Sequence, residues 1–561
     1  MLPTTPRSAF RETLDLARTF RRDEDGSLIA FSLFIFFCMI LFGGIAVDLM
    51  IYENERTHVQ NSTDRAVLAA ANLNQTVDPK EVVKDYLAKV NITVTDDDID
   101  VFEVGAAPVI TGRQVSVDVS GGYQTLLMRL VGVETLPFAT TSQAEESVSD
   151  VEVSLVLDVS GSMGDNNKLE NMQDAATDFV DNILAGAEDD RVSLSLVPYS
   201  TQVNAGPLLF SSLTTHHNHN YSHCVNFAQE DFAQNSLQRS RQARDQYGNL
   251  RYTNAGEPIM EPISLSQTAH FDPWRSYQSG MSVSMPVCRT ESFSQITPWS
   301  NDAAALRTQI ESFTAEGNTS IDVAVKWGVA LLDPSTNGAL NDFTAAGRVD
   351  NAFSVRPHPY GRQDSLKFIV VMTDGINTDQ FYLRDSFKEG NSPYYKNNSS
   401  NDIYWEREEP SDRDRDSRYR EDWYNITDKN WTNSPGTLTR LSWLDAWANM
   451  TLQRRAYAYY HFTGNNSDFY DNYYDPYRTV PARSNNASTD TKDRRLSQIC
   501  SAAKAQNIVI FTIGFEVTDE SAEIMRDCAS TPQHFYRVEG LDIEYAFSSI
   551  ANQINQLKLT Q

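Results

Sequence analysis

The segment from Ser27 to Val47, SLIAFSLFIFFCMILFGGIAV, constrains the fold most, because about 20 residues pass without a charged side chain. An apolar run of that length is sufficient to cross a bilayer as an α-helix. Five arginines precede the run, whereas only Arg56 and Arg65 lie close behind it. The positive-inside rule therefore predicts a cytoplasmic tail at residues 1–26 and an exterior location for the chain after residue 50.

A cleaved signal peptide is the alternative for this segment, since Gly44 and Ala46 form a small-x-small pattern that resembles a cleavage site. The apolar run exceeds the usual signal-peptide core of about 7–15 residues, which favours retention as an anchor. The following stretch, residues 53–74, is polar and then alanine-rich and lacks glycine and proline. We therefore expect residues 27–75 to form a transmembrane helix and its outward extension.

Two further regions differ in their hydrophobic pattern. Residues 76–149 predict a small α+β module, in which a helical KEVVKDYLAKV precedes the strand-like RQVSVDVSGG and LPFATTSQAEE. From residue 150 to residue 561, buried strands such as VEVSLVLD, RVSLSLVPYS, LKFIVVMTD and IVIFTIGF alternate with amphipathic helices. This alternation is typical of a doubly wound, Rossmann-like α/β domain with a parallel sheet covered on both faces.

Two long insertions interrupt the α/β pattern, at about residues 202–300 and 377–493. The second is crowded with Tyr, Trp, Asn, Asp and Arg. We expect surface loops at residues 406–425 and 465–486, with helix only in residues 439–462 between them. The formal charge of the chain is 47 − 75 = −28. Nonspecific binding to nucleic acid or to an anionic membrane surface is therefore not expected.

Four cysteines lie in the proposed exterior part, and Cys38 lies in the apolar run. An even number suits disulfides in an oxidising compartment. The sequential pairing Cys224–Cys288 and Cys500–Cys528 is the simplest of three connectivities, among which spacing alone does not choose. The motif HHNHNYSHC, residues 216–224, could instead hold a transition metal through its four histidines, but Cys224 is better used in a disulfide.

Oxygen-bearing side chains follow three strand ends. Asp158, Ser160 and Ser162 lie where the first α/β strand meets glycines, Thr319 lies just ahead of a helix, and Asp374 follows another strand. Ligands collect at the carboxyl edge of a parallel sheet, so we expect these five residues to meet there. Two carboxylates with three hydroxyls suit Mg²⁺, with Mn²⁺ or Ca²⁺ as alternatives. A site with so few anionic ligands would leave a position for an acidic group of a partner.

Catalytic motifs are missing from the sequence. It contains no H-E-x-x-H, G-x-S-x-G or G-x-x-x-x-G-K-[ST] motif. No histidine lies in a motif that would place it beside Ser160 or Ser162 as a base. We therefore expect a protein that is not an enzyme, with a metal-assisted hydrolase as the weaker alternative.

The motifs DVSGSM, EGNTS and MTDG, in this order, resemble the metal-ion-dependent adhesion site (MIDAS) of von Willebrand factor A domains. The resemblance covers Val151 to about Leu557 once the two insertions are removed. It implies a von Willebrand A fold for residues 150–561. It also implies that the metal is held, partly through water, by five ligands: Asp158, Ser160, Ser162, Thr319 and Asp374.

The N-terminal segment resembles the anchor of TadE/TadG-like proteins of Tad (Flp) pilus assembly, with a glycine before the apolar run, VDL at its end and VQNSTDRAVLAAA after it. The C-terminal segment, from CSAAKAQNIVIFTIGFEV onward, is similar to TadG proteins with a von Willebrand domain. Two positions depart from the family pattern. Phe31 stands where prepilin-like processing after Gly26 requires glutamate, so no cleavage is expected there, and Arg65 interrupts the small-residue run.

This resemblance implies a single-pass protein of the Gram-negative inner membrane, with its main domain in the periplasm or at the cell surface. It would act in pilus assembly, surface adherence and biofilm formation. Its expected partners are other Tad assembly proteins or pilus subunits, bound through an acidic residue. The alternative is a cell-surface adhesin that is not needed for pilus assembly.

Overall fold

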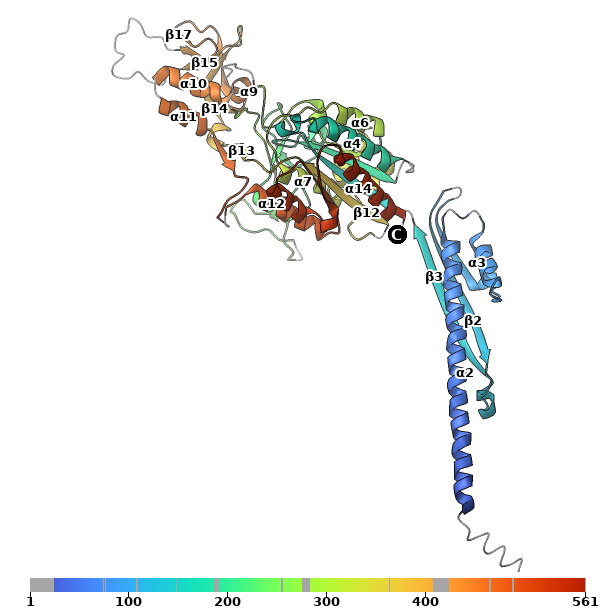
Figure 1. The fold of residues 1–561 in the computed structure, drawn as a ribbon. Helices are drawn as coiled ribbons and strands as arrows, with labels where there is room; N and C mark the ends of the chain where they lie inside the picture. The colour runs from blue at the N-terminus through green and yellow to red at the C-terminus, as the bar shows by residue number, and fades with distance from the viewer. Residues whose placement is uncertain are drawn as a thin grey trace, which may run out of the picture. The chain divides into compact units, whose positions relative to one another are not determined.

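The computed structural model describes residues 25–559 except 74, 76, 107–108, 148, 186–190, 254–255, 275–282, 363, 407–422, 464–465 and 487–488. The expected cytoplasmic tail thus lies almost wholly outside the described residues. The chain divides into a small unit that ends at Val148 and a large unit, Ser149–Thr560. In Figure 1 the small unit is blue to cyan, and the large unit runs from green to red.

The small unit is built on one long helix. Its elements are α2 (Asp25–Ala71), α3 (Pro79–Ala88), η1 (Asp96–Asp98), β1 (Ile99–Ala106), β2 (Val109–Gln124), η2 (Met128–Val131) and β3 (Thr135–Ser147). Helix α2 is continuous, as the absence of glycine and proline after the apolar run predicts. Among the described residues it alone is long and apolar enough to cross a membrane. The three strands form an antiparallel sheet in the order β1-β2-β3.

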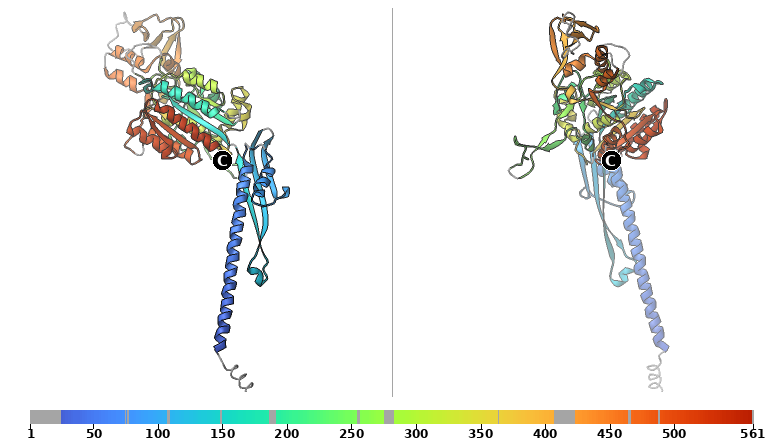
Figure 2. Two further views of the ribbon diagram at one scale, coloured as in Figure 1. Left: turned by 45° about the vertical axis from the view of Figure 1, so that its right-hand side comes forward. Right: turned by 90° about the vertical axis from the view of Figure 1, so that its left-hand side faces the viewer.

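The alanine-rich half of α2 packs on α3 and on the sheet. Its buried Ala66 and Ala70 share a hydrophobic core with Leu87 of α3 and with Val115 and Val117 of β2. Small side chains on α2 allow this close approach of helix and sheet. Figure 2 shows the β2–β3 hairpin running along α2 in both views.

A buried carboxylate fastens the tip of this hairpin to α2. Asp48 accepts hydrogen bonds from the backbone N–H groups of Leu126, Leu127 and Met128, at 3.0, 2.8 and 2.6 Å. The Tyr123 hydroxyl donates to the same carboxylate at 3.2 Å. One turn earlier, Gly44 has no side chain to keep Leu127 away, since a Cβ there would lie 2.8 Å from Leu127 Cδ1. The hairpin tip therefore packs directly on the end of the apolar run.

The large unit contains the predicted doubly wound sheet. Its six strands have the order β11-β5-β4-β12-β20-β21, parallel except for β11. Their bounds are β4 (Asp150–Asp158), β5 (Val192–Tyr199), β11 (Thr297–Ser300), β12 (Ser365–Thr373), β20 (Val509–Phe515) and β21 (Phe535–Val538). The antiparallel edge strand β11 lies at the end of the first insertion, which the sequence pattern did not assign to the sheet.

Helices cover both faces of this sheet, and successive side chains of β12 alternate between two cores. Phe368 and Val370 pack with α4 (Lys168–Leu184), α6 (Ala303–Glu311) and α14 (Asp542–Leu559). Ile369 and Val371 pack with α7 (Ile321–Ala330), α8 (Asn337–Ala345), α12 (Lys492–Lys504) and α13 (Asp519–Cys528). Strands buried on both faces explain the near-continuous Val, Ile and Leu of their sequences.

The first insertion contains short strands and one short helix. These are α5 (Gly206–Ser211), β6 (Thr215–His216), β7 (Val225–Asn226), η4 (Gln229–Ala233), β8 (Ser240–Gln242), β9 (Met260–Pro262), β10 (Leu265–Gln267) and η5 (Ser292–Ser294). The disulfide Cys224–Cys288 closes the insertion, and Cys500–Cys528 joins α12 to α13. Both predicted pairings are confirmed.

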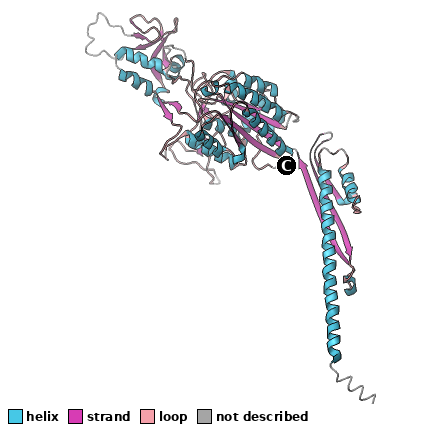
Figure 3. Ribbon diagram, in the orientation of Figure 1, coloured by secondary structure: helices cyan, strands magenta, loops and turns pink. Residues whose placement is uncertain are grey.

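The second insertion is folded. Residues 439–462 contain helix as predicted, whereas the expectation of a surface loop was wrong for residues 466–480, which form a helix and a strand. The insertion forms a five-stranded sheet, β17-β16-β15-β14-β18, and a two-stranded sheet, β13-β19. Figure 3 shows these strands, in magenta, beside helices in cyan. The bounds are β13 (Gln380–Leu383), β14 (Asn391–Asn397), β15 (Ile403–Glu406), β16 (Trp423–Asn425), β17 (Asn430–Thr432), β18 (Leu438–Ser442), α9 (Trp443–Asn449), α10 (Leu452–Thr463), α11 (Asn466–Tyr474) and β19 (Tyr477–Val480).

Aromatic packing replaces aliphatic periodicity in this insertion. The rings of Trp443 and Trp447 stack at 5.5 Å, and Phe387 meets Trp443 edge-on at 4.9 Å. The first insertion joins the same core, because Phe271 and Val287 pack with residues of the second. The two insertions therefore fold against each other. The acidic stretch at residues 407–422, also expected to be a loop, lies outside the described residues.

Replacing the carboxylate that holds the hairpin tip tests its role. In Asp48→Ala, the N–H groups of residues 126–128 lose their acceptor, so we expect their amide hydrogen exchange to accelerate about tenfold or more. Exchange is measured by mass spectrometry on the full chain in lipid nanodiscs. Asp118→Ala is the matched control, since Asp118 accepts an exposed hydrogen bond from Thr141 in the same hairpin. Equal exchange in both variants would contradict this role.

A second prediction concerns the close packing of α7 on the sheet. A Cβ at Gly328 would lie 2.7 Å from Ile369 Cδ1 and from Val156 Cγ2, both in the buried core. Gly328→Val should therefore lower the free energy of unfolding by about 1–3 kcal/mol. Gly338→Ala is the control, because nothing lies within 4 Å of a Cβ there. Thermal denaturation of the two variants should show a lower melting temperature for Gly328→Val alone.

Candidate functional site

The first loop of the candidate site begins where β4 ends. Asp158 is fully buried, and its Oδ1 accepts a hydrogen bond from the backbone N–H of Ser160 at 2.8 Å. The Thr373 hydroxyl donates to Asp158 Oδ2 at 2.8 Å. Helical turn η3 (Gly161–Gly164) follows and turns the chain across the sheet edge. The carboxylate is thereby fixed between the ends of two neighbouring strands.

The second and third loops meet the first at this edge. Ser162 Oγ donates to Asp374 Oδ1 at 2.7 Å and lies 3.2 Å from Ser160 Oγ. Thr319 Oγ1 and Ser162 Oγ both border Gly375, at 4.0 and 3.9 Å from the position of a Cβ there. The structure therefore places all five predicted site residues in one cluster.

The charges of the cluster are two carboxylates and one ammonium group. Burial, and next the negative charge of Asp374, raise the pKa of Asp158 to about 7. Lys168, at the start of α4, donates to Asp374 Oδ2 at 3.0 Å and lies 3.8 Å from Glu516 Oε2. Lys168 was not among the residues predicted for the site, although it is the first basic residue after the D-x-S-x-S loop.

The donor set fits a hard divalent cation. Every one of the five side chains offers oxygen, and carboxylates with hydroxyls and water suit Mg²⁺ better than zinc or copper. Across the part of the chain that the structure describes, no three side chains of His, Cys, Asp or Glu converge as a metal site. A cation at this edge would therefore depend on the hydroxyls of Ser160, Ser162 and Thr319.

A buried network holds the Thr319 loop in place. Lys492 Nζ donates to the Thr319 carbonyl at 2.9 Å and to Ser320 Oγ at 2.6 Å. It also lies 3.7 Å from Asp322 Oδ1, and both side chains are fully buried. Burial lowers the pKa of Lys492 to about 8 and raises that of Asp322. Sequence reasoning had no signal for Lys492, which lies 173 residues from Thr319.

Both ends of the second insertion lie beside the loop that carries Thr319. The Asn377 side chain accepts from the backbone N–H of Ile321 at 2.9 Å and donates to Asp493 Oδ1 at 3.0 Å. Thr378 Oγ1 accepts from the backbone N–H of Thr319 at 3.0 Å. Both ends of the insertion are thus joined to the loop that carries Thr319.

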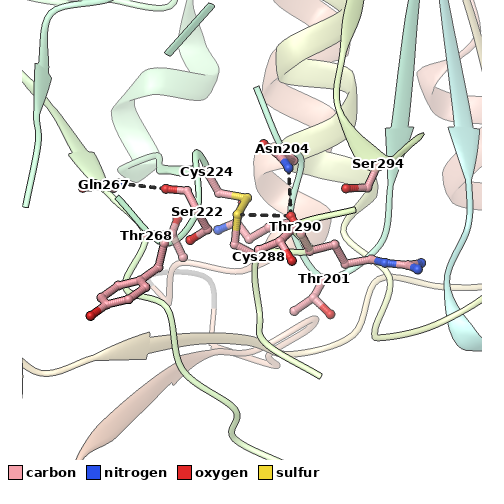
Figure 4. The surroundings of a disulfide bond; sticks show 12 residues. Thr201, Asn204, Ser222, Cys224, Gln267, Thr268, Cys288, Thr290 and Ser294 are labelled. Carbon is pink, nitrogen blue, oxygen red and sulfur yellow. Dashed lines mark hydrogen bonds between the residues drawn. A yellow bond between two sulfur atoms is a disulfide. The ribbon is translucent and has the colours of Figure 1, made fainter. Parts of the chain in front are cut away.

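The first insertion supports the same loop from the side of β5. Thr201 Oγ1 accepts from the backbone N–H of Asn318 at 2.8 Å, and Ser320 Oγ donates to the Thr201 carbonyl at 2.7 Å. Figure 4 shows the Cys224–Cys288 disulfide in the same region as Thr201. Asn204 Nδ2 donates a hydrogen bond to the carbonyl of Arg289, which follows Cys288. The disulfide therefore fixes the return of the first insertion close to the candidate site.

The histidine-rich motif does not form the transition-metal site that was weighed as an alternative. Cys224 is disulfide-bonded, and His219 Nε2 bonds the Thr268 carbonyl at 2.9 Å. The ring of Tyr221 lies 5.7 Å from that of His219 and 5.8 Å from that of His270, which it stacks on. These contacts give His219 of the motif a packing role.

Residues 26–73, at the N-terminal end of the chain, match the Tad family model, which is described as Flp pilus-assembly TadE/G-like. The resemblance predicted from the glycine, the apolar run and the VDL motif is confirmed for this segment. No curated protein gives a significant match to the sequence.

Several solved structures are similar to the chain at low identity. The vWF domain of the type V pili tip protein Mfa5 from Porphyromonas gingivalis is 13% identical, with a TM-score of 0.31, over 74% of this chain and 97% of that one. The pilus adhesin SpaC from Lactobacillus rhamnosus GG is 10% identical, with a TM-score of 0.29, over 82% of this chain and 35% of that one. The PilB minor pilin from Streptococcus sanguinis is 11% identical, with a TM-score of 0.29, over 82% and 77%. We base the fold on the strand order of this chain.

Breaking the buried Lys492–Asp322 pair should be costly, whereas removing both charges should not. We expect Lys492→Met to lower the free energy of unfolding by about 3–5 kcal/mol, because it removes the ammonium group that lies 3.7 Å from the buried Asp322 carboxylate. The double variant Lys492→Met/Asp322→Leu should recover most of that loss. Chemical denaturation of the parent, the single variants Lys492→Met and Asp322→Leu, and the double variant gives the double-mutant cycle. Additive losses would show that the two groups are not coupled.

Proposed function

We propose that this chain is a membrane-anchored component of Tad/Flp pilus assembly that binds an acidic partner through a metal-ion-dependent adhesion site, and so promotes surface adherence and biofilm formation. The observation that carries the proposal is the presence in one chain of two features. One is the pilus-assembly segment at residues 26–73. The other is the cluster of five oxygen-bearing side chains at one edge of the α/β sheet.

Five side chains would hold the cation: Asp158, Ser160, Ser162, Thr319 and Asp374. Bound Mg²⁺ would supply a centre of positive charge that attracts a carboxylate of the partner. The chain itself supplies only two negative charges there, and Lys168 offsets part of the charge of Asp374. The site therefore favours an additional anionic ligand from outside.

Exposure of the cluster agrees with binding of a partner. Asp158 and Ser160 are buried, whereas Ser162 is exposed and Gly375 is half-buried. The neighbouring Ile376 presents an exposed apolar side chain. An acidic group could thus approach from the side of Ser162, with an apolar contact beside it.

The chemistry of the serines favours binding over catalysis. The hydroxyl of Ser162 donates to Asp374, and the hydroxyls of Ser160 and Ser162 lie within hydrogen-bond distance of each other. A nucleophilic serine requires a neighbouring base that accepts its proton, and Asp374 is instead shared with Lys168. We therefore propose a role that is not enzymatic.

The proposed location is the inner membrane, with the tail in the cytoplasm and the large unit in the periplasm. Helix α2 supplies one apolar span, preceded by five arginines. The two disulfides in the large unit suit an oxidising compartment. The partners would then be other pilus-assembly proteins or pilus subunits.

Titration calorimetry with Mg²⁺ tests the site directly. The full chain in nanodiscs should bind Mg²⁺ saturably. Asp158→Ala/Ser160→Ala should weaken binding by more than about 100-fold, because loss of outer partners alone costs 10–100-fold.

The matched control is Asp402→Ala/Ser400→Ala, which removes an exposed Asp–Ser pair of the second insertion and should leave Mg²⁺ affinity unchanged. Circular dichroism confirms that each variant is folded. Failure of the folded parent to bind Mg²⁺ or Mn²⁺ would reject the adhesion-site mechanism.

Deletion and site variants in the native bacterium test the biological role. We expect the deletion strain, and a strain carrying Asp158→Ala/Ser160→Ala, to lose pili in electron micrographs and to form less biofilm. The Asp402→Ala/Ser400→Ala strain should keep both. Intact pili with lost attachment to a surface would instead assign the chain to the adhesins that are not needed for assembly.

A further inference from the structure

The tip of the β2–β3 hairpin in the small unit has an unusual surface for a loop. Residues 126–131 have the sequence LLMRLV, and the side chains of Leu126, Leu130 and Val131 are 58%, 75% and 46% exposed. Single exposed apolar residues are common on protein surfaces, but a contiguous apolar patch marks contact with a membrane or a partner. The tip therefore presents an apolar surface of the kind that contacts a membrane or a protein partner.

Six backbone N–H groups at the tip are satisfied within the protein. Three N–H groups, of Leu126, Leu127 and Met128, donate to the Asp48 carboxylate. Three more, of Leu130, Gly132 and Val133, donate to backbone carbonyls of residues 127–129. Irregular backbone tolerates an apolar medium only when its polar groups are paired internally. The tip thus combines apolar side chains with donors that do not need water.

The position of the tip along α2 coincides with the end of the apolar run. Leu127 packs on Gly44, three residues before Val47, and Asp48 directly follows the run. At a rise of about 1.5 Å per residue, Gly44 lies about 4.5 Å inside the end of the apolar segment. On the helix beside it, Val47 and Met50 are also exposed. The apolar surface of the tip is therefore continuous with that of the spanning helix.

From these observations we infer that the hairpin tip, residues 126–131, inserts into the outer leaflet of the bilayer that α2 spans. Leu126, Leu130 and Val131 enter the boundary between acyl chains and headgroups, and the long side chain of Arg129 reaches the phosphate level. The occupant of this surface is lipid. The inference rests on the proposed membrane anchoring by α2 and adds a second contact that fixes the small unit against the membrane.

Spin labels placed on the full chain measure the depth of the tip. Leu130→Cys is made in a Cys38→Ser background, in which the four remaining cysteines are disulfide-bonded. The nitroxide-labelled chain is reconstituted in vesicles of phosphatidylethanolamine and phosphatidylglycerol. We expect the label at residue 130 to be relaxed by oxygen, which partitions into lipid, and to lose access to a water-soluble nickel chelate.

Two matched labels separate this inference from the anchoring on which it rests. Phe34→Cys lies within the apolar run, and Leu68→Cys lies on the same helix beyond it, where Leu68 is 66% exposed. A label at residue 34 that meets the nickel chelate would reject the anchor itself. With residue 34 in lipid and residue 68 in water, access of the chelate to residue 130 would overturn the inference alone. A label at residue 130 shielded from both oxygen and the chelate would overturn it too, in favour of a protein partner.

Discussion

The parallel pairing of β4 with β12 is the constraint on which the large unit depends. The register runs from Ser365 opposite Asp150 to Met372 opposite Leu157, so the two strands end side by side. Asp158 is the last residue of β4 and Asp374 directly follows β12, and the Thr373 hydroxyl donates a hydrogen bond to Asp158. Parallel strands end at one carboxyl edge of the sheet. The strand pairing alone therefore brings together two aspartates that are far apart in sequence. The hydroxyls of the cluster then depend on the turns that these strands begin.

Maintenance of the Thr319 loop requires buried charge in addition to the sheet. Lys492 bonds the Thr319 carbonyl from within the core, opposite Asp322. A buried ion pair adds little net stability over apolar packing, but loss of either partner is costly. These contacts of Lys492 therefore favour one position of the Thr319 loop, because movement of the Lys492 ammonium group would separate it from both the Thr319 carbonyl and Asp322. Helix α7 contributes through Gly328, whose missing side chain allows the helix to lie close to β4 and β12.

Sequence reasoning predicted the elements whose periodicity is local and missed those that depend on distant packing. Four buried strands and the long N-terminal helix followed from apolar runs. The meeting of the five predicted residues at one sheet edge followed from their loops, and their role as metal ligands stays a prediction. The fold of the second insertion did not follow from the sequence, because its strands are short and its core is made of rings such as Trp443 and Trp447 rather than aliphatic residues. Part of that core, including Phe271, comes from the other insertion. The residue pattern of one segment does not indicate which distant segment packs against it. For the same reason the sequence did not indicate that Lys492 bonds the Thr319 loop.

The two insertions begin at the same edge of the sheet as the site. The first starts after β5, which ends at Tyr199, and the second starts after β12, which ends at Thr373. Both are parallel strands of one sheet, so both insertions leave it at the carboxyl edge. Thr201 from the first insertion, and Asn377 with Thr378 from the second, bond the loop that carries Thr319. A partner that binds at this edge would therefore lie close to residues of both insertions. The hydrogen bonds at the starts of the insertions also make the position of the Thr319 loop depend on the conformation of the insertions.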